Sequence, residues 1–453
     1  MPIHRVYEET EAQLAGVVET ANDIASSARK ALVNDDKGMT VFNALSWERE
    51  EVVELPAEIM GMKDEKDQAV PIQETAGKHY ASVTVPSCGW ANFEPADPKI
   101  PDNTIKITYK LMENNLIRTE FNEFGEITSI YDKINQSELA TGLCNSLKMY
   151  QDIPSAFDAW DIDSMYRQQP VEMSEKAEVE VRAEGPLFGQ LVVKRQLNNS
   201  TMTQTITLRW DSRRMDFHTV IDWQERHKLL KVNFPVDYHA REALHEIQFG
   251  HLPRPTHRSR EIDRDRYEVC NQKWTALVEA DRGFAVLNDS KYGVDVLDNS
   301  INLTLLKSAL APDMTADRGY QEFAYAFYFW DTPFMESGLV QQGYALNVPL
   351  QVVEGKAGNR SLFQLDQPNI ILETVKPAED CSGDLVLRLY ESMGNKTRAK
   401  LTTSLPVKYA YQADMLEHVL ETLALDEQGL TLLFRPFEIK TLRLVTRIPA
   451  DFE

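Results

Sequence analysis

The sequence predicts a mainly β protein with one long helix at its N-terminus, and three observations support this fold class. Residues 3–33 are the only long stretch in which apolar residues recur with a helical period. From about residue 37 onward, short runs alternate apolar and polar residues between polar turns, as half-buried strands do. Four of these runs, in residues 187–238, are long and closely spaced.

The helix over residues 3–33 is predicted from a stripe of apolar residues at spacings of three and four. Basic residues near its end, Arg29 and Lys30, suit the negative end of the helix dipole. A helix of this length is about 45 Å long, and its stripe needs a cover. No sister helix follows in the sequence. The stripe therefore packs on a sheet, pairs between chains, or belongs to a bundle whose other helices lie outside this chain.

The β region begins with MTVFNAL, EEVVELP and YASVTVP, which read as short strands. The proline-rich stretch 95–103 predicts a linker, and residues 104–132 predict a hairpin. The four runs in 187–238 predict an antiparallel meander within a large sandwich rather than a small barrel. Further short runs from about residue 360 predict a separate terminal sandwich.

Composition and charge exclude several classes of function. The chain has 453 residues, 48 Lys and Arg against 70 Asp and Glu, and a net charge of −22. This acidity argues against nucleic acid or a membrane surface as partner. No apolar run approaches the length of a membrane span, and the N-terminus has no apolar signal core. The cysteines are far apart and form no CxxC pair, which fits reduced thiols and a cytoplasmic location.

The most suggestive chemistry lies in FDAWDID, residues 157–163. Retaining glycosidases need two carboxylates about 5 Å apart, which Asp158 and Asp161 could provide, and Trp160 could stack on a sugar ring. The alternative is a turn cluster with Trp160 in the core. A calcium loop is a weaker alternative, because the segment lacks the glycine and terminal glutamate of such loops.

Other polar segments give less specific signals. Histidines recur at positions 239, 245, 251 and 257, but along one strand they would span roughly 20 Å and could not share a zinc ion. Residues 254–274 are dense in charge and predict a salt-bridged crossing loop. Residues 305–321 predict a strand followed by a long polar loop, a common place for function.

Several strings together resemble one enzyme family. HEIQFGHLPRPTH, YEVCNQKW, LNDSKYG, LLKSALAPDMTADRGYQEFAYAF and PFEIKTLRL resemble the C-terminal half of the glycoside hydrolase family 38 α-mannosidases, closest to the bacterial and cytosolic branch. FDAWDID resembles that branch's D-A-W-D segment, and VFNALSWERE its first β segment after the helices. The likeness runs in order over nearly the whole chain.

The resemblance implies a fold and a division of the chain. The resemblance implies that full-length members consist of a zinc-bearing barrel, then a three-helix bundle, then β-sandwich domains. We therefore expect a remnant bundle helix in residues 1–36, a small β-sandwich in 37–97, a large antiparallel supersandwich similar to galactose mutarotase in 98–355, and a C-terminal β-sandwich in 356–453. The chain looks like a family member cut just after its last zinc ligand.

The resemblance also implies which residues bear on the site. The zinc ligands, the nucleophile and the acid/base are expected upstream, so no catalytic or metal-binding residue is predicted here, and zinc is expected only in the full-length enzyme. Asp158, Trp160, Asp161 and Lys307 are predicted to help bind substrate. Relatives more often carry Arg where Lys307 stands, which puts a bidentate clamp at that position in doubt.

The predicted function is that of the C-terminal β domains of a zinc-dependent retaining α-mannosidase, inactive as this chain alone. The expected partners are α-mannoside glycans and the N-terminal catalytic domain in cis, with a homo-oligomer left open. One alternative is a stand-alone carbohydrate-binding or scaffold module that uses Trp160. Another is a lyase or epimerase with Asp158 and Asp161 as acid and base.

Overall fold

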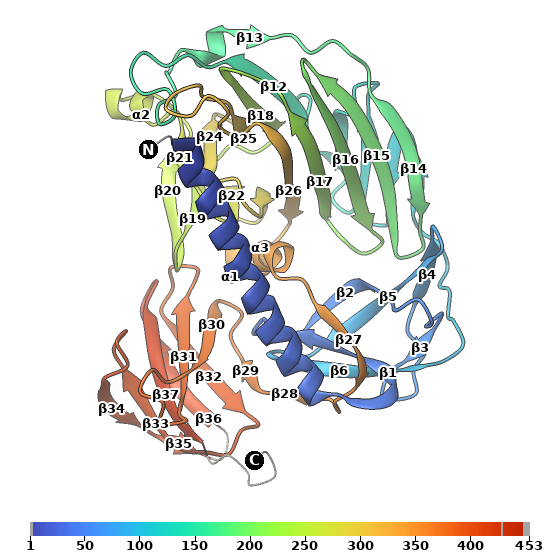
Figure 1. Cartoon of the computed structure of the whole chain (residues 1–453), viewed down its shortest axis with the longest axis vertical. Coiled ribbons are helices and arrows are strands. Elements are labelled where there is room, and N and C mark those ends of the chain that lie inside the picture. Colours follow the sequence, from blue (N-terminus) through green and yellow to red (C-terminus); the bar gives the residue numbers. More distant parts are fainter. Residues whose placement is uncertain (1–2, 427–428, 447–453) are drawn as a thin grey trace.

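The computed structural model describes residues 3–426 and 429–446 of the chain. These residues form one long helix and three bodies of β structure (Figure 1). The mainly β fold class is therefore confirmed. The predicted domain boundaries stay a prediction.

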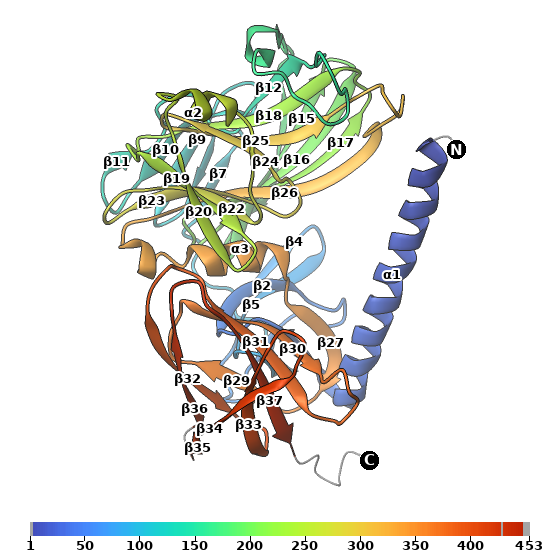
Figure 2. The same cartoon turned by 90° about the vertical axis from the view of Figure 1, so that its left-hand side faces the viewer.

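The long helix α1 (Ile3–Leu32) stands to one side of the β domains, as Figure 2 shows. It meets the strand β27 (Gln351–Lys356) near its C-terminal end. Its N-terminal end lies toward the end of the large sandwich (Figures 1 and 2). The apolar residues of its stripe are exposed along the described helix: Val6, Tyr7, Leu14, Val17, Val18, Ile24 and Leu32. The helix prediction is confirmed to within one residue, and its apolar stripe has no cover in the described part of the chain.

The first β body is a small sandwich of two antiparallel sheets around Met39, Val41, Val83 and Phe93. One sheet has the order β27-β1-β6-β28, with β3 also pairing with β6. Its strands are β1 (Asn34–Asn43), β3 (Met62–Lys63), β6 (Gly89–Pro95) and β28 (Arg360–Ser361). The other sheet has the order β2-β5-β4, with β2 (Arg49–Glu54), β4 (Ile72–Thr75) and β5 (Lys78–Val85). Strand β27 thus joins a sheet formed some 300 residues earlier in the chain.

The large sandwich stacks two long antiparallel sheets. The first sheet has the order β14-β15-β16-β17-β26-β23-β22-β19-β20. Its strands are β14 (Glu178–Glu184), β15 (Phe188–Leu197), β16 (Ser200–Arg209), β17 (Arg214–Trp223), β19 (Glu242–Ile247), β20 (Gly250–Pro255), β22 (Trp274–Val278), β23 (Gly283–Asn288) and β26 (Gly319–Trp330).

The second sheet of the large sandwich has the order β13-β12-β18-β25-β24-β21. Its strands are β12 (Ser146–Gln151), β13 (Pro170–Val171), β18 (Lys228–Pro235), β21 (Val269–Cys270), β24 (Gly293–Leu297) and β25 (Ser300–Lys307). A smaller sheet, β11-β10-β9-β8-β7, shares the core of the large sandwich and contains the predicted hairpin. Its strands are β7 (Lys106–Thr108), β8 (Leu111–Glu113), β9 (Ile117–Phe121), β10 (Ile127–Asp132) and β11 (Ser137–Glu138).

The predicted four-strand meander over 187–238 is wrong at its last strand. Strands β15, β16 and β17 pair in sequence, but β18 lies in the second sheet, between β12 and β25, and β26 takes the place beside β17. The reason is packing: Phe234 of β18 faces Phe217 of β17 across the core, with ring centroids 6.2 Å apart. A short polar connection can join two stacked sheets as well as it closes a hairpin, so the spacing of the runs did not distinguish the two.

The C-terminal sandwich begins after β28 and closes around Leu387, Leu389, Leu401 and Phe434. Its sheets have the orders β29-β32-β36-β35 and β30-β31-β37-β33-β34. The strands are β29 (Phe363–Leu365), β30 (Ile370–Pro377), β31 (Leu385–Glu391), β32 (Thr397–Thr403), β33 (Val407–Ala413), β34 (Val419–Leu423), β35 (Leu425–Asp426), β36 (Gly429–Phe434) and β37 (Ile439–Thr446). The predicted terminal sandwich is confirmed.

Short helices link these bodies. The 3-10 helix η1 (Tyr166–Gln168) and helix α2 (Glu261–Asp265) lie in loops of the large sandwich, while η2 (Phe334–Glu336) and α3 (Leu339–Asn347) follow β26. Gly338 precedes α3 with a φ of 66°, a left-handed conformation that favours glycine. This turn directs α3 into the space where the three β bodies meet (Figure 1).

Candidate functional site

The FDAWDID segment lies in the loop between β12 and β13, at one end of the large sandwich. Asp152 at the start of this loop donates its backbone N–H to the carbonyl of His227, 2.8 Å away. His227 in turn donates its backbone N–H to the carbonyl of Ser308, 2.7 Å away. Three loops, residues 152–169, 224–227 and 308–318, therefore meet at this end of the sandwich, and we call their meeting point the rim.

The side chain of Asp158 holds the three loops of the rim together. Its Oδ2 accepts hydrogen bonds from the backbone N–H groups of Leu310 (2.7 Å) and Ala311 (3.0 Å) and from Nε2 of His227 (3.0 Å). Partial burial raises the pKa of Asp158, but these hydrogen bonds outweigh it and hold the pKa below its usual range. Asp158 is thus an ionised carboxylate that joins the three loops.

Asp161 closes the turn that presents Trp160. Its carboxylate accepts a hydrogen bond from the backbone N–H of Phe157 (3.2 Å), and its own N–H donates to the Phe157 carbonyl (2.8 Å). Asp163 continues the pattern by accepting from the N–H of Ser155. The carboxylates of Asp158 and Asp161 therefore bind different partners, and each has a structural role in this loop.

Trp160 projects from the braced loop into solvent. Its side chain is 73% exposed, and that of the neighbouring Phe157 is 63% exposed. The two rings meet edge to face, with centroids 6.2 Å apart. On the adjoining loop, Met314 is 70% exposed. The alternative that places Trp160 in the core is therefore wrong, because the indole is among the most exposed apolar side chains described.

Lys307, the last residue of β25, is held by the same loop. Its Nζ donates to the carboxylate of Asp152 and to the backbone carbonyl of Asp161, the latter at 2.9 Å. The Asp152 side chain is almost fully buried, and this burial raises its pKa although the contact with Lys307 opposes the rise. Lys307 therefore anchors the segment that carries Trp160. Substrate binding by Asp158, Trp160, Asp161 and Lys307 stays a prediction.

Sequence reasoning missed the residues that hold the rim together. His227 and the backbone N–H groups of Leu310 and Ala311 bind Asp158 across 69 to 153 positions of sequence. His227 has a φ of 47°, which directs its loop toward the second sheet. The QERHK string signalled only a turn, so nothing local predicted its contact with Asp158.

A second polar cluster lies nearby on the open face of the second sheet. The buried Lys231 pairs with Glu268 (2.5 Å) and Asp295 (3.0 Å), and Asp295 also pairs with Arg167. Burial lowers the pKa of Lys231, but its two carboxylate partners outweigh it and raise the pKa above its usual range. Glu268 comes from the charged stretch 254–274, which was predicted to be salt-bridged. These groups satisfy one another beside a cavity of about 230 Å³.

The histidines that recur every six residues do not converge. His245 is buried in β19, whereas His239 lies outside the strands and its side chain is exposed. Within residues 3–426 and 429–446, no three His, Cys, Asp or Glu side chains gather in a way that could hold a metal ion. The described residues therefore do not fit a zinc ion, and we assign no step of a reaction to a metal on them.

Among the helices described, none is both long enough and apolar enough to cross a membrane.

Comparison with known families matches two parts of the chain. Residues 112–315, which include the whole rim apart from residues 316–318, match the glycosyl hydrolases family 38 C-terminal domain. Residues 369–442, in the C-terminal sandwich, match the glycosyl hydrolases family 38 C-terminal beta sandwich domain.

Individual relatives match over most of this chain. Alpha-mannosidase 2C1 of Mus musculus is 36% identical over 95% of this chain and 42% of its own length. Alpha-mannosidase 2C1 of Homo sapiens is 34% identical over 99% of this chain and 44% of its own length. The chain thus spans less than half of each of these relatives.

A solved structure shares the fold. The crystal structure of an alpha-mannosidase from Enterococcus faecalis V583 matches with a TM-score of 0.72 and 17% identity, over 94% of this chain and 59% of that chain. At this identity the likeness shows the fold alone.

Proposed function

Because this chain belongs to glycosyl hydrolase family 38, as the part that carries its C-terminal domains, we propose that it supplies the β domains of a zinc-dependent retaining α-mannosidase. Its substrates would be α-mannosides in glycans, and its location the cytoplasm. The matched relatives support this activity, since both are named alpha-mannosidase.

The chemistry of such an enzyme would be carried by another domain. In a retaining glycosidase one carboxylate attacks the sugar and a second protonates the leaving oxygen. A zinc ion, when bound, helps to hold the sugar hydroxyls. We assign none of these roles to this chain, because Asp158 and Asp161 are engaged in bracing their own loop. We therefore propose that the chain alone does not hydrolyse mannosides.

The contribution of this chain would be the rim. The observation that carries this proposal is the 73% exposed Trp160 on a loop that Asp158 and Lys307 fix in place. An indole face suits the C–H face of a sugar ring, and a rigid loop positions it with little loss of entropy on binding. The exposed stripe of α1, whose N-terminal end lies toward the same end of the sandwich, offers a surface for the remaining domain (Figure 2).

Activity assays test the two parts of this proposal. The purified 453-residue chain, supplied with zinc, is expected to release no phenol from an aryl α-mannoside. Zinc-dependent release would contradict its inactivity. If the gene also encodes residues upstream of this chain, the longer protein is expected to hydrolyse the same substrate. In that longer protein, Trp160→Ala is expected to raise the KM more than it lowers the kcat. A whole protein without α-mannosidase activity would overturn the proposed function.

A stand-alone glycan-binding module is the second candidate, and the exposure of Trp160 favours it too. Calorimetric titration of the chain with mannose oligosaccharides distinguishes the two. Saturable binding that is lost in Trp160→Ala, together with no hydrolysis by any longer product, would favour the binding module.

A further inference from the structure

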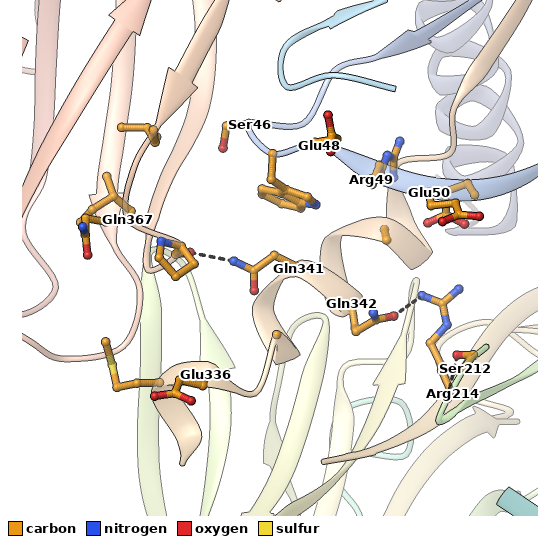
Figure 3. A pocket seen from close by; sticks show the side chains of 18 of the residues that line it. Ser46, Glu48, Arg49, Glu50, Ser212, Arg214, Glu336, Gln341, Gln342 and Gln367 are labelled. Atoms are coloured by element: carbon orange, nitrogen blue, oxygen red, sulfur yellow. Dashed lines mark hydrogen bonds between the residues drawn. The ribbon is translucent and has the colours of Figure 1, made fainter. Parts of the chain in front are cut away.

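A large cavity lies where the small sandwich, the large sandwich, α3 and the C-terminal sandwich meet. Its volume is about 630 Å³, within the range typical of ligand sites, which often lie between domains. Four segments line it: residues 46–51, the turn 209–214 between β16 and β17, residues 335–345, and residues 365–370 (Figure 3). We call it the junction cavity.

Side-chain contacts between the bodies hold the walls of the junction cavity. Gln342 of α3 accepts a hydrogen bond at Oε1 from Arg214 Nη1 (2.9 Å), and Gln341 donates from Nε2 to the carbonyl of Pro368 (2.7 Å), as Figure 3 shows. Arg209 Nη1 pairs with Glu51 Oε2 across two bodies at 2.8 Å. The cavity is therefore preorganised by contacts from every side.

Other polar groups on the same walls remain without partners. Among the described residues, the exposed carboxylates of Glu48 and Glu336 accept no hydrogen bond and form no ion pair, and the half-buried side-chain amide of Gln367 makes no hydrogen bond. They come from three different segments of the lining (Figure 3). Trp47 adds an aromatic surface beside them, with its ring 5.9 Å from that of Tyr344 in edge-to-face contact.

The charges of the lining argue against an anionic ligand. Acidic residues outnumber the arginines in the lining, and two of the three arginines are paired with carboxylates: Arg209 with Glu51, and Arg214 with Asp216. Arg49 is 7% exposed, donates to the carbonyl of Val348, and has a pKa lowered by burial. The lining thus offers unpartnered acceptors, the carboxylates of Glu48 and Glu336, and unpartnered donors, Nε and Nη1 of the buried Arg49. The amide of Gln367 can both donate and accept. Beside an indole, such groups suit a neutral, hydroxyl-rich ligand.

From these observations we propose that the junction cavity is a second carbohydrate site, which binds a neutral oligosaccharide. Glu48 and Glu336 accept hydrogen bonds from its hydroxyls, Gln367 adds donor and acceptor groups, and Trp47 packs against a ring. The choice of a mannose oligosaccharide as its ligand rests on the proposed function, whereas the neutral glycan class rests on the lining.

The junction cavity is separate from the rim. Arg214 of the cavity wall begins β17, and His227 of the rim follows four residues after the end of that strand. A strand of 10 residues spans about 33 Å at about 3.3 Å per residue. A glycan held in the cavity therefore leaves the rim free, so that the enzyme can hold a branched or polymeric substrate at a distance from the point of cleavage.

The test is calorimetric titration of the 453-residue chain with α-mannotriose, with spermidine and inorganic phosphate as charged probes. Saturable binding of mannotriose is expected, with a Kd raised at least tenfold in the double variant Glu48→Gln/Glu336→Gln, because each change weakens a hydrogen bond to a charged acceptor. Glu65→Gln, which alters an exposed carboxylate of the small sandwich outside the cavity lining, is the matched control, and Trp160→Ala the rim control. Glu65→Gln is expected to leave Kd unchanged, and Trp160→Ala distinguishes binding at the rim from binding in the junction cavity.

Several outcomes would overturn the site. These are no saturable binding of any neutral oligosaccharide, binding that is lost in Trp160→Ala but kept in the double variant, or spermidine or phosphate as the only probe that binds. Melting curves of the double variant check that it is folded. If maltotriose binds and mannotriose does not, the site stands and the proposed mannosidase function fails. If the whole protein cleaves mannosides while the chain binds no sugar, this inference fails alone.

Discussion

The rim and the junction cavity use the same kinds of residue in opposite ways. In the rim, Asp158 and Asp161 have protein partners and Trp160 faces solvent. In the junction cavity, Glu48 and Glu336 have no partner among the described residues, whereas Trp47 packs against Tyr344. Carboxylates beside a tryptophan therefore do not identify a site by themselves. What distinguishes the two regions is which groups are still free to bind a ligand.

Replacing Trp47 should have the largest effect on stability. Trp47→Ala removes a ring that packs into the cluster around α3 and is expected to destabilise the chain by about 2–3 kcal/mol, somewhat less than for a fully buried ring. The measurement is the shift of the urea midpoint, followed by tryptophan fluorescence. An effect below about 0.5 kcal/mol, the usual range for surface changes, would mean that Trp47 does not support the junction.

Replacing Asp158 should give the next largest effect. Asp158→Ala leaves the N–H groups of Leu310 and Ala311 without their acceptor, which costs about 1–3 kcal/mol. Hydrogen exchange is expected to speed up at these two amides and at the loop 308–318. Glu336→Gln is the matched control, because its carboxylate holds no such loop in the described structure. Unchanged exchange at Leu310 would show that Asp158 does not brace the rim.

The ionisation of Asp158 gives a smaller effect that depends on pH. Its pKa is lowered in the folded chain, so it stabilises the fold fully above its unfolded pKa of about 3.9. This contribution is lost as the pH falls through the lowered folded value. The difference in melting temperature between the chain and Asp158→Asn should therefore be largest near neutral pH and shrink below about pH 4. A difference that grows at acid pH would reverse the assigned direction.

The sequence predicted elements far better than it predicted contacts. The helix over residues 3–33, the hairpin within 104–132 and the terminal sandwich follow from apolar periodicity, which depends on neighbours in the chain. The place of β18 did not follow, because a turn such as 224–227 looks the same whether it closes a hairpin or crosses between sheets. Periodicity shows which face of a strand is buried, and not which strand lies beside it.

The two sites show the same limit. FDAWDID identified a loop rich in acids, but the partners of Asp158 lie up to 153 positions away, and only folding reveals that its Oδ2 already accepts three hydrogen bonds. The junction cavity had no signal in the sequence at all. Its lining is drawn from segments near residues 48, 211, 340 and 367, each of which is an ordinary turn or helix by itself.

The smallest effect on stability is expected for the most exposed ring. Trp160→Ala removes an indole that is 73% exposed and whose nearest aromatic neighbour is itself on the surface, so the urea midpoint should move by less than about 0.5 kcal/mol. The same change should nevertheless weaken substrate binding by the whole enzyme, because the solvent-facing Trp160 ring is free to stack on a sugar. Trp47→Ala provides the contrast, since it should lower stability first. If Trp160→Ala destabilises the chain as much as Trp47→Ala, the exposed ring is a structural support, and the distinction between rim and junction fails.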